Sequence, residues 1–473
     1  MKQVNRNKVI QVTDQRYRPR YHIATPGGWL NDPNGLCYYQ GYYHVFYQYH
    51  PYSAEWGPMH WGHVRSKDLV HWEQLPVALV PGDPEDTGGC FSGSAMVKDG
   101  RLYLLYTGHH YYDDGDQDHF WENQNVAYSD DGIHFTKYAG NPVISAPADN
   151  SQDFRDPKVW QHQGKYYLVL GSRERATNQG RILLYQSTDL LHWKLSGTMF
   201  DVTTVKNTGK MLECPDFFHL AGKDILLCSP MGLPATAKNF MNLSQVCYSV
   251  GQLDYANCRF TGTDLQELDK GHNFYATQTM ATPDQRRIMI AWTSPFEESM
   301  PEKADGWAGI LTIPRELTLR DGHLYNQPVR EMATLRVRTD YDGQFKLAGR
   351  RELTVSDPQH SEFTLTFPTA VTGQFSWQLN DQQGQLISLT YRNGELVLDR
   401  RGPDGKRYAE LPAGLRDLRI FVDTSSVEIF VNSGWVSFTD RYYATGRVSC
   451  QVTSDHEQSA QVQIYTLGTE KGL

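Results

Sequence analysis

The sequence has no excess of basic residues and no long apolar run. Its 473 residues carry a formal net charge of −9, and the pI is near 6.0. Nucleic acids and anionic membrane surfaces bind basic faces of proteins, so neither is expected as a partner. No stretch approaches the about 20 apolar residues that span a bilayer, and residues 1–20 are too polar for a signal peptide. We therefore expect a cytoplasmic protein with a neutral or small substrate.

Cysteine is sparse, and recognisable metal and phosphate motifs are missing. The seven cysteines show neither Cys-x-x-Cys nor Cys-x-x-His spacing, which argues against a disulfide framework and a zinc site. His60 and His63 have no third ligand at a suitable spacing, and the acidic loop 113–116 lacks the twelve-residue calcium pattern. There is no phosphate-binding glycine motif and no Gly-x-Ser-x-Gly elbow. We expect neither a metal nor an organic cofactor.

A repeat of about sixty residues dominates the first two thirds of the chain. An apolar, tyrosine-rich strand signal recurs with starting points 58 to 64 residues apart, at Gly41, Gly100, Gly164, Gly222 and Arg286. A polar turn followed by an aromatic residue trails three of these signals, at 66–72, 129–135 and 187–193. Repetition on this scale without helical periodicity indicates a solenoid or a propeller, and sixty residues suit four short strands. We predict a five-bladed β-propeller over residues 20–325.

The repeat ends near residue 340, where alternating strand patterns take over. Five such patterns fall at 363–367, 396–398, 418–422, 427–431 and 462–465, with hairpin turns at Asn393-Gly394 and Asn432-Ser433-Gly434. They predict a β-sandwich over residues 341–473. Residues 326–340 are expected to be a linker, with a short helix after Pro328.

Three carboxylates occupy the same position in their repeats. Asp32 and Glu213 lie nine residues before a strand glycine, while Ser92 and Asp156 lie eight residues before one. The first strand of each propeller blade lines the channel, so residues in one repeat phase should converge there. A single Asp-Pro or Glu-x-Pro is more often turn punctuation, but the shared phase favours a common pocket. Crowded carboxylates raise one another's pKa, and glycoside hydrolysis needs one ionised and one protonated carboxyl group.

Aromatic residues are frequent around these positions. Sugar rings have apolar faces and a rim of hydroxyls, so aromatic walls with amide, Arg and carboxylate groups suit them. Most aromatic residues here are expected in the core. Trp56 and Trp292 are the exceptions, because they lie in or after strand ends near the channel phase. The full set of neighbouring aromatics is Trp29, Phe46, Tyr47, Trp56, Trp61, Phe91, Phe274, Tyr275 and Trp292.

Four motifs in order resemble glycoside hydrolase family 32, the invertases and other β-fructofuranosidases. They are Trp29-Leu30-Asn31-Asp32-Pro33-Asn34-Gly35, Phe91-Ser92-Gly93-Ser94, Phe154-Arg155-Asp156-Pro157 and Glu213-Cys214-Pro215. The resemblance covers nearly the whole chain, since that family couples a five-bladed propeller to a β-sandwich, and residues 423–430 are similar to a recurrent sandwich motif of the family.

The resemblance assigns roles to individual residues. It implies that Asp32 is the nucleophile, Glu213 the acid and base, and Asp156, with Arg155 beside it, the group that stabilises the transition state. It also implies sugar contacts from Trp29, Leu30, Asn31, Gln48, Trp56, Phe91, Ser92 and Trp292. One departure is Asn273, where the family usually carries Asp.

The implied reaction is a double displacement with retention, for which the two carboxyl groups should lie about 5–5.5 Å apart. Three alternatives stay open: an inverting arabinan or xylan hydrolase, a sugar-binding propeller without catalysis, and a fructosyltransferase. The substrate, whether sucrose, sucrose 6-phosphate or a short fructan, is equally open. A 6-phosphate would need Lys or Arg at the glucose end of the pocket. The sandwich offers a surface through which subunits could form a homo-oligomer.

Overall fold

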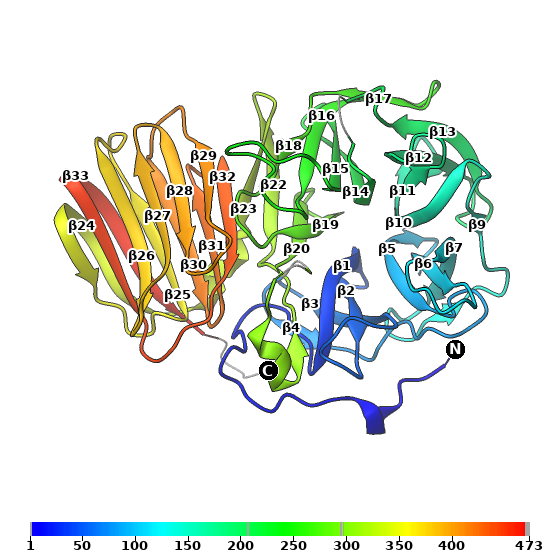
Figure 1. The fold of residues 1–473 in the computed structure, drawn as a ribbon, viewed down its shortest axis with the longest axis horizontal. Coiled ribbons are helices and arrows are strands. Elements are labelled where there is room, and N and C mark those ends of the chain that lie inside the picture. Colours follow the sequence, from blue (N-terminus) through cyan, green and yellow to red (C-terminus); the bar gives the residue numbers. More distant parts are fainter. Residues whose placement is uncertain (1, 206–207, 294–295, 297, 469–473) are drawn as a thin grey trace.

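Two β-structures lie side by side in the molecule (Figure 1). The computed structural model describes residues 2–205, 208–293, 296 and 298–468. In this part of the chain, five largely antiparallel sheets surround a central space, and a ten-stranded assembly follows them. The predicted all-β fold, a five-bladed propeller followed by a C-terminal β-sandwich, is confirmed. The three helices among these residues are single 3-10 turns, η1 (Arg6–Lys8), η2 (Pro301–Asp305) and η3 (Arg330–Leu335), and none could cross a bilayer.

Each blade begins at the central space and runs outward. The innermost strands are β1 (Gly28–Tyr39), β5 (Gly89–Lys98), β10 (Asn150–His162), β14 (Met211–Leu220) and β19 (Tyr275–Ala281). The repeated strand signals are the second strands, β2 (Tyr42–His50), β6 (Arg101–Tyr111), β11 (Lys165–Glu174), β15 (Lys223–Met231) and β20 (Arg287–Trp292). The outer strands are β3 (His60–Ser66), β4 (Trp72–Gln74), β7 (Phe120–Ser129), β8 (Thr136–Lys137), β9 (Ile144–Ser145), β12 (Gly180–Ser187), β13 (Lys194–Phe200), β16 (Cys247–Asp254), β17 (Arg259–Gly262), β18 (Gln266–Glu267), β22 (Arg315–Arg320) and β23 (His323–Pro328).

The ring of blades is closed by a short exchange between its ends. The chain leaves β20 of the last blade, forms β21 (Trp307–Ala308) beside β1 of the first blade, and returns to the last blade as β22. The β21 and β1 strands are parallel, with Gly28 opposite Trp307. The first and last blades are therefore held together by backbone hydrogen bonds as well as by side-chain packing.

The polar turns predicted between outer strands share one geometry. In three blades an Asp carboxylate accepts backbone N–H groups of the turn and meets the ring of a His three residues later at 2.7 Å, as in Asp68 with His71, Asp131 with His134 and Asp189 with His192. Asp side chains that bond the backbone two and three residues on stabilise such turns. Each of these turns is therefore stabilised by residues within the turn itself.

The sandwich consists of two layers that share one long strand. Its strands are β24 (Arg336–Leu353), β25 (Ser361–Thr366), β26 (Gln374–Asp381), β27 (Gly384–Arg392), β28 (Glu395–Arg400), β29 (Lys406–Glu410), β30 (Asp417–Asp423), β31 (Ser426–Val431), β32 (Val436–Arg441) and β33 (Ser449–Leu467). β33 pairs with β26 along its first half and with β25 along its second half, so it passes from one layer to the other. Both predicted hairpin turns are present, with positive φ at Asn393, Gly394, Asn432, Ser433 and Gly434.

A buried charge network joins the two domains. Arg315 on β22 is fully buried and reaches Glu428 on β31 at 2.5 Å and Asp269 at 2.9 Å. His22 lies between Asp423 and Glu428, with ring nitrogens 2.7 and 2.9 Å from the two carboxylates. Burial alone would lower the pKa of His22, but the hydrogen bonds to Asp423 and Glu428 outweigh it and raise that pKa to about 9. The two acidic residues of the sandwich motif therefore attach the sandwich to the propeller.

The raised pKa makes the contribution of His22 to stability dependent on pH. It is fully present below about 6.5, where His is protonated in both the unfolded and folded states, and it is lost as the pH rises through about 9. The difference between 6.5 and about 9 corresponds to about 3 kcal/mol. We expect His22→Gln to lower the melting temperature markedly at pH 6 and much less at pH 9.5. Calorimetry at both pH values tests this, and a gap between variant and parent that does not change with pH would contradict it.

Candidate active site

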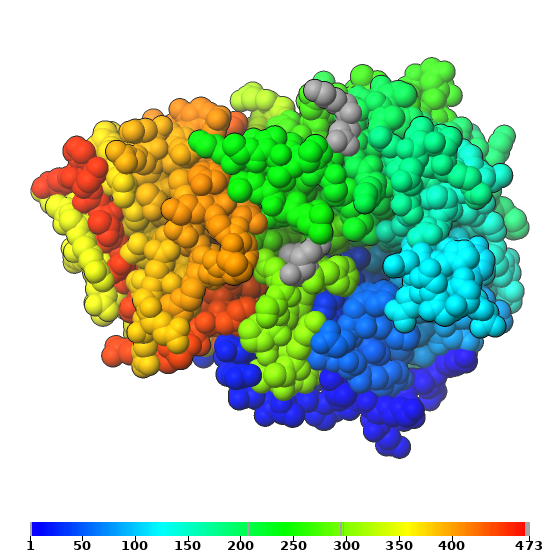
Figure 2. Space-filling model, viewed as in Figure 1, coloured from blue at the N-terminus to red at the C-terminus, as the bar shows by residue number. Residues whose placement is uncertain are grey.

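One cavity of about 320 Å³ opens at the centre of the propeller. Its mouth is the hollow in the middle of the propeller face in Figure 2. Residues from every blade border it, together with a segment that follows β20: Asn31, Asp32, Gln48, Trp56, Phe91, Ser92, His109, Tyr111, Gln117, Asp118, Phe120, Glu122, Arg155, Asp156, Glu213, Tyr275 and Phe296. The three carboxylates predicted to converge do border one cavity.

A register shift occurs in all five innermost strands at the level of the cavity. The shifts fall between Leu30 and Pro33, Phe91 and Gly93, Arg155 and Lys158, Glu213 and Asp216, and Tyr275 and Gln278. Proline fits in a sheet at such irregular positions because it needs no N–H partner there. The Asp-Pro and Glu-x-Pro sequences are therefore bulges in continuous strands and not turns between elements.

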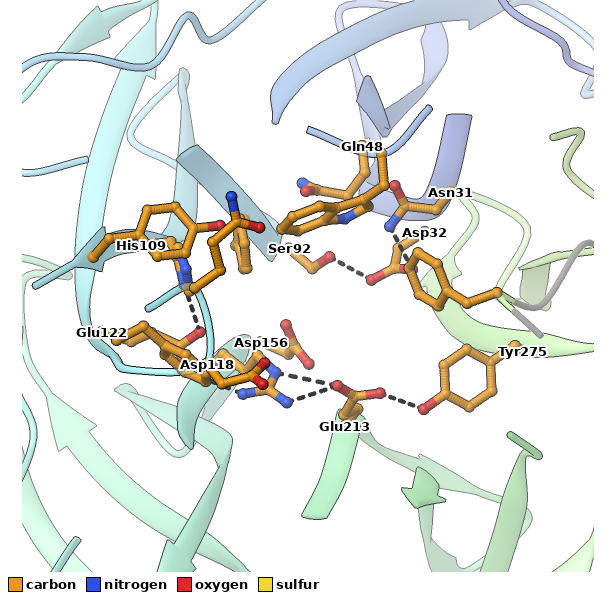
Figure 3. Close-up of a pocket in the computed structure, with 17 residues that line it drawn as sticks. Asn31, Asp32, Gln48, Ser92, His109, Asp118, Glu122, Asp156, Glu213 and Tyr275 are labelled. Carbon is orange, nitrogen blue, oxygen red and sulfur yellow. Dashed lines mark hydrogen bonds and ion pairs between the residues drawn. The ribbon is translucent and has the colours of Figure 1, made fainter. Parts of the chain in front are cut away.

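Asp32 is held by neutral donors. The Ser92 hydroxyl donates to its Oδ2 at 2.5 Å, and the Asn31 side-chain amide donates to its Oδ1 at 3.0 Å (Figure 3). The Trp29 indole N–H in turn donates to Asn31 Oδ1 at 2.8 Å and so fixes the amide orientation. Burial raises the pKa of Asp32, these hydrogen bonds oppose the rise, and the nearby charge of Glu213 adds to it.

Glu213 stands across the cavity in a different environment. Arg155 reaches one of its carboxylate oxygens through Nη2 at 2.7 Å and Nε at 3.2 Å, and the Tyr275 hydroxyl donates to the other oxygen (Figure 3). Arg155 also contacts Asp153 at 2.6 Å and Glu122 at 3.4 Å. One guanidinium is thus shared among three carboxylates and cannot neutralise Glu213 completely.

Asp156 completes the group, and Cys214 connects it to Asp32. The Cys214 backbone N–H donates to Asp156 Oδ2 at 2.9 Å, while the Cys214 thiol lies 3.6 Å from that oxygen and 3.5 Å from Asp32 Oδ2. Burial raises the pKa of Asp156 to about 8, with the charges of Glu213 and Asp32 adding to the rise and Arg155 opposing it. The raised pKa favours the protonated form of Asp156 near neutral pH.

One side of the cavity is an aromatic wall from the second blade, together with Trp56 of the first blade. Phe91 and His109 are stacked with ring centroids 4.1 Å apart, and Tyr111, Phe120 and Trp56 extend the surface. His109 is held by Glu122 at 3.2 Å. Of these aromatic residues, only Trp56 and Phe91 were expected to contact substrate.

Most of the cavity residues that could not be predicted from the sequence lie outside the innermost strands, whose repeat phase identified the carboxylates. His109 and Tyr111 belong to the second strand of their blade, Phe120 and Glu122 to the third, and Gln117 and Asp118 to the loop between them. Tyr275 had been recognised only as a nearby aromatic residue. No sequence signal distinguishes these residues from others on the same strands, except that the acidic loop 113–116 adjoins two of them.

Three residues expected to contact the sugar do not border the cavity. Leu30 is fully buried in the core. Trp29 and Trp292 are also buried and do not reach the cavity surface. Both tryptophans pack against Phe296, which does border it, with ring centroids 5.6 and 5.0 Å away. The other predicted contacts, Asn31, Gln48, Trp56, Phe91, Ser92 and Arg155, all border it. Across the described ranges, no three His, Cys, Asp or Glu side chains are grouped to hold a metal ion.

Comparisons with known proteins agree along the whole chain. Residues 22–328 match the Glycosyl hydrolases family 32 N-terminal domain, and residues 331–466 match the Glycosyl hydrolases family 32 C terminal. The chain is 40% identical over 431 residues to an Escherichia coli raffinose invertase, covering 90% of this chain and 89% of the relative. It is 39% identical over 438 residues to an Escherichia coli sucrose-6-phosphate hydrolase, with coverage of 90% and 89%.

Solved structures give the same result. A mutant of a Bombyx mori GH32 beta-fructofuranosidase in complex with sucrose has a TM-score of 0.86 and 38% identity, over 96% of this chain and 95% of the other. A sucrose-6-phosphate hydrolase from Lactobacillus gasseri has a TM-score of 0.87 and 30% identity, over 97% and 94%. Two family domains that together span the propeller and the sandwich leave one assignment: the chain belongs to glycosyl hydrolase family 32 and is a glycosidase.

Proposed function

We propose that the protein is a retaining β-fructofuranosidase that hydrolyses the terminal fructosyl bond of sucrose. One observation carries the proposal: two carboxyl groups at one cavity have different partners. Asp32 accepts hydrogen bonds from neutral donors, whereas Glu213 is bound by the shared Arg155 guanidinium and by the Tyr275 hydroxyl. The two environments suit two different tasks, and pairs of carboxyl groups in unlike surroundings are typical of acid–base division in glycosidases.

Asp32 is the proposed nucleophile. Its partners are a hydroxyl and an amide, which orient a carboxylate without neutralising it as a cation would. In the first step it attacks the anomeric carbon while the protonated Glu213 transfers its proton to the glycosidic oxygen, and the bond to glucose breaks. The Glu213 carboxylate that results is stabilised by Arg155 and by the Tyr275 hydroxyl.

The second step restores the enzyme. The ionised Glu213 removes a proton from water, whose oxygen attacks the anomeric carbon and releases Asp32 and fructose. Asp156 is fixed by the Cys214 N–H, and in its ionised form it accepts hydrogen bonds from fructosyl hydroxyls and stabilises the positive charge that develops on the ring. Two inversions give net retention.

The charges around the cavity favour an unphosphorylated substrate. Arg155 is the only Lys or Arg among the described residues that border the cavity, and it is already engaged by three carboxylates. Asp118 adds negative charge on the side of the aromatic wall. A phosphate there would meet like charge without a free cation. We therefore propose sucrose over sucrose 6-phosphate. A cytoplasmic location and pairing of subunits through the sandwich remain predictions.

We expect Asp32→Asn to lower kcat for fructose release from sucrose by about a thousandfold or more, because no covalent intermediate can form. Glu213→Gln should lower it about a hundred- to ten-thousandfold, the range for general acid–base catalysis. Asp224→Asn, which alters a carboxylate on the same blade but away from the cavity, is the control and should keep near-parental activity.

The same assay tests retention. With methanol as acceptor, NMR should identify the methyl fructoside as the β anomer, since a second displacement restores the configuration. The α anomer would instead identify an inverting enzyme, and no fructose release by the parent protein would remove the proposed function altogether.

Substrate charge gives an independent prediction. The parent enzyme should favour sucrose over sucrose 6-phosphate at least about tenfold in kcat/KM, because placing like charges together costs a kcal/mol or more. Asp118→Asn should raise kcat/KM for sucrose 6-phosphate and so bring the kcat/KM values of the two sugars closer together. Asp113→Asn changes the same loop away from the cavity and serves as the control. A parent enzyme that prefers the phosphorylated sugar would contradict the charge argument while leaving the fructosidase assignment intact.

Burial of the Asp32 carboxylate, with the nearby charge of Glu213, should cost stability. The pKa of Asp32 is raised, so its penalty is absent below its unfolded value near 3.8 and grows as the pH rises toward the folded value. Asp32→Asn removes the charge and should raise the melting temperature at pH 8 by about 2 °C, the shift for about 1 kcal/mol in a large domain, and by less at pH 4. Asp216→Asn should do the opposite, because it leaves the buried Lys158, 2.9 Å from Asp216, without its ion pair. Equal melting temperatures for parent and Asp32→Asn at pH 8 would show that the buried charge of Asp32 does not lower stability.

A further inference from the structure

A segment of the propeller is held by the sandwich at the edge of the cavity. Between β20 and β21 the chain passes through Phe296, which borders the cavity, and Glu298, which faces the sandwich. Arg400, at the end of β28, donates through Nη2 to a Glu298 carboxylate oxygen at 2.9 Å. The Arg400 side chain is 8% exposed and that of Glu298 is 23% exposed, so this ion pair is largely shielded from solvent.

Asn273 completes the attachment by using both ends of its amide. Its Nδ2 donates to Glu298 Oε2 at 2.7 Å, and its Oδ1 accepts from Arg400 Nη1 and, at 2.9 Å, from the backbone N–H of Arg441. An Asp at this position could accept from the two arginines but would face the Glu298 carboxylate with like charge. Asn273 stands where the family usually carries Asp, and its amide N–H can donate to Glu298, which a carboxylate could not do.

A second ion pair holds the same segment further along. Glu302 in η2 is fully buried and accepts from Arg441 Nη2 at 3.0 Å. The sandwich thus contacts the segment at Glu298 through β28 and at Glu302 through β32. On its propeller side, Phe296 packs against Trp29 and Trp292 and presents its exposed part to the cavity.

We propose that Arg400 is a positioning residue for substrate binding: by holding Glu298 together with Asn273, it sets the place of Phe296 in the wall of the sugar site. The sandwich then contributes to sugar affinity as well as to stability. This rests on the proposed function, because it requires a sugar in the cavity. Phe296 contacts the sugar in both ground and transition states, so its displacement weakens both to the same extent and appears in KM.

The test compares two matched substitutions. Arg400→Gln removes the ion pair to Glu298 and leaves, among the described residues, only the hydrogen bond from Asn273. Arg407→Gln removes a similarly buried arginine of the neighbouring strand β29, which bonds Asn242 of the propeller at 2.8 Å across the same domain interface. We expect Arg400→Gln to raise KM for sucrose about five- to twentyfold with kcat within about threefold of the parent. Arg407→Gln should leave both constants near the parent values, and Arg400→Lys should restore part of the affinity.

Hydrogen exchange of residues 293–306 supplies a readout that needs no activity. Faster exchange in residues 298–306 of this range is expected in Arg400→Gln, but not in Arg407→Gln. Unchanged KM and unchanged exchange in Arg400→Gln would overturn the proposal, as would equal KM increases in both variants, which would indicate domain docking alone. If the parent protein releases no fructose, the proposed function fails, and the exchange comparison still decides whether Arg400 positions the segment. Asn273→Asp should show the same rise in KM, and its absence would remove Asn273 from the proposal.

Discussion

The convergence of five innermost strands on one axis is the constraint on which the site depends. Each strand breaks its register at the same height, and the residues at or beside the break border the cavity. Asp156 and Cys214 adopt positive φ there, with values of 66° and 45°, which non-glycine residues rarely do. The surrounding sheet compensates this local strain, because each bulge is flanked by regular pairing to the second strand. The propeller thus supplies a rigid frame in which carboxylates can be held closer than they would remain in water.

At the cavity, negative side chains outnumber positive ones. Among the described residues, five carboxylates border the cavity with one guanidinium, that of Arg155, which contacts Glu122 and Glu213 of this set and also Asp153. Arg155 gives the Glu213 carboxylate a cationic partner, and without any cation this partly buried charge would be unpaired. The neutral surroundings of Asp32, a hydroxyl and an amide, keep that carboxylate available for attack.

The sequence allowed the repeat, the two domains and the meeting of Asp32, Asp156 and Glu213 to be predicted, because period and phase are properties of the backbone. The resemblance to the family also implied that Asn31, Gln48, Trp56, Phe91, Ser92 and Arg155 lie near the site. The sequence did not identify His109, Tyr111 or Phe120, whose positions depend on how later strands of a blade turn back toward the axis. Trp29 and Trp292 were expected to contact the sugar, yet they do not border the cavity, and both pack against Phe296, which does. Packing of this kind depends on partners distant in sequence, which local patterns do not encode.

Ring closure through β21 also affects when the propeller can fold during synthesis. The first blade is complete only when Trp307 and Ala308 have paired with β1, and Phe296 precedes them in the chain. During synthesis, a nascent chain that already contains Asp32, Asp156 and Glu213 therefore still lacks the strand that joins the ends of the ring. Domains generally fold as units, so the carboxylates are brought together only late in translation, after almost two thirds of the polypeptide has left the ribosome. A truncated product ending before Trp307 would consequently be a poor catalyst and a target for proteolysis.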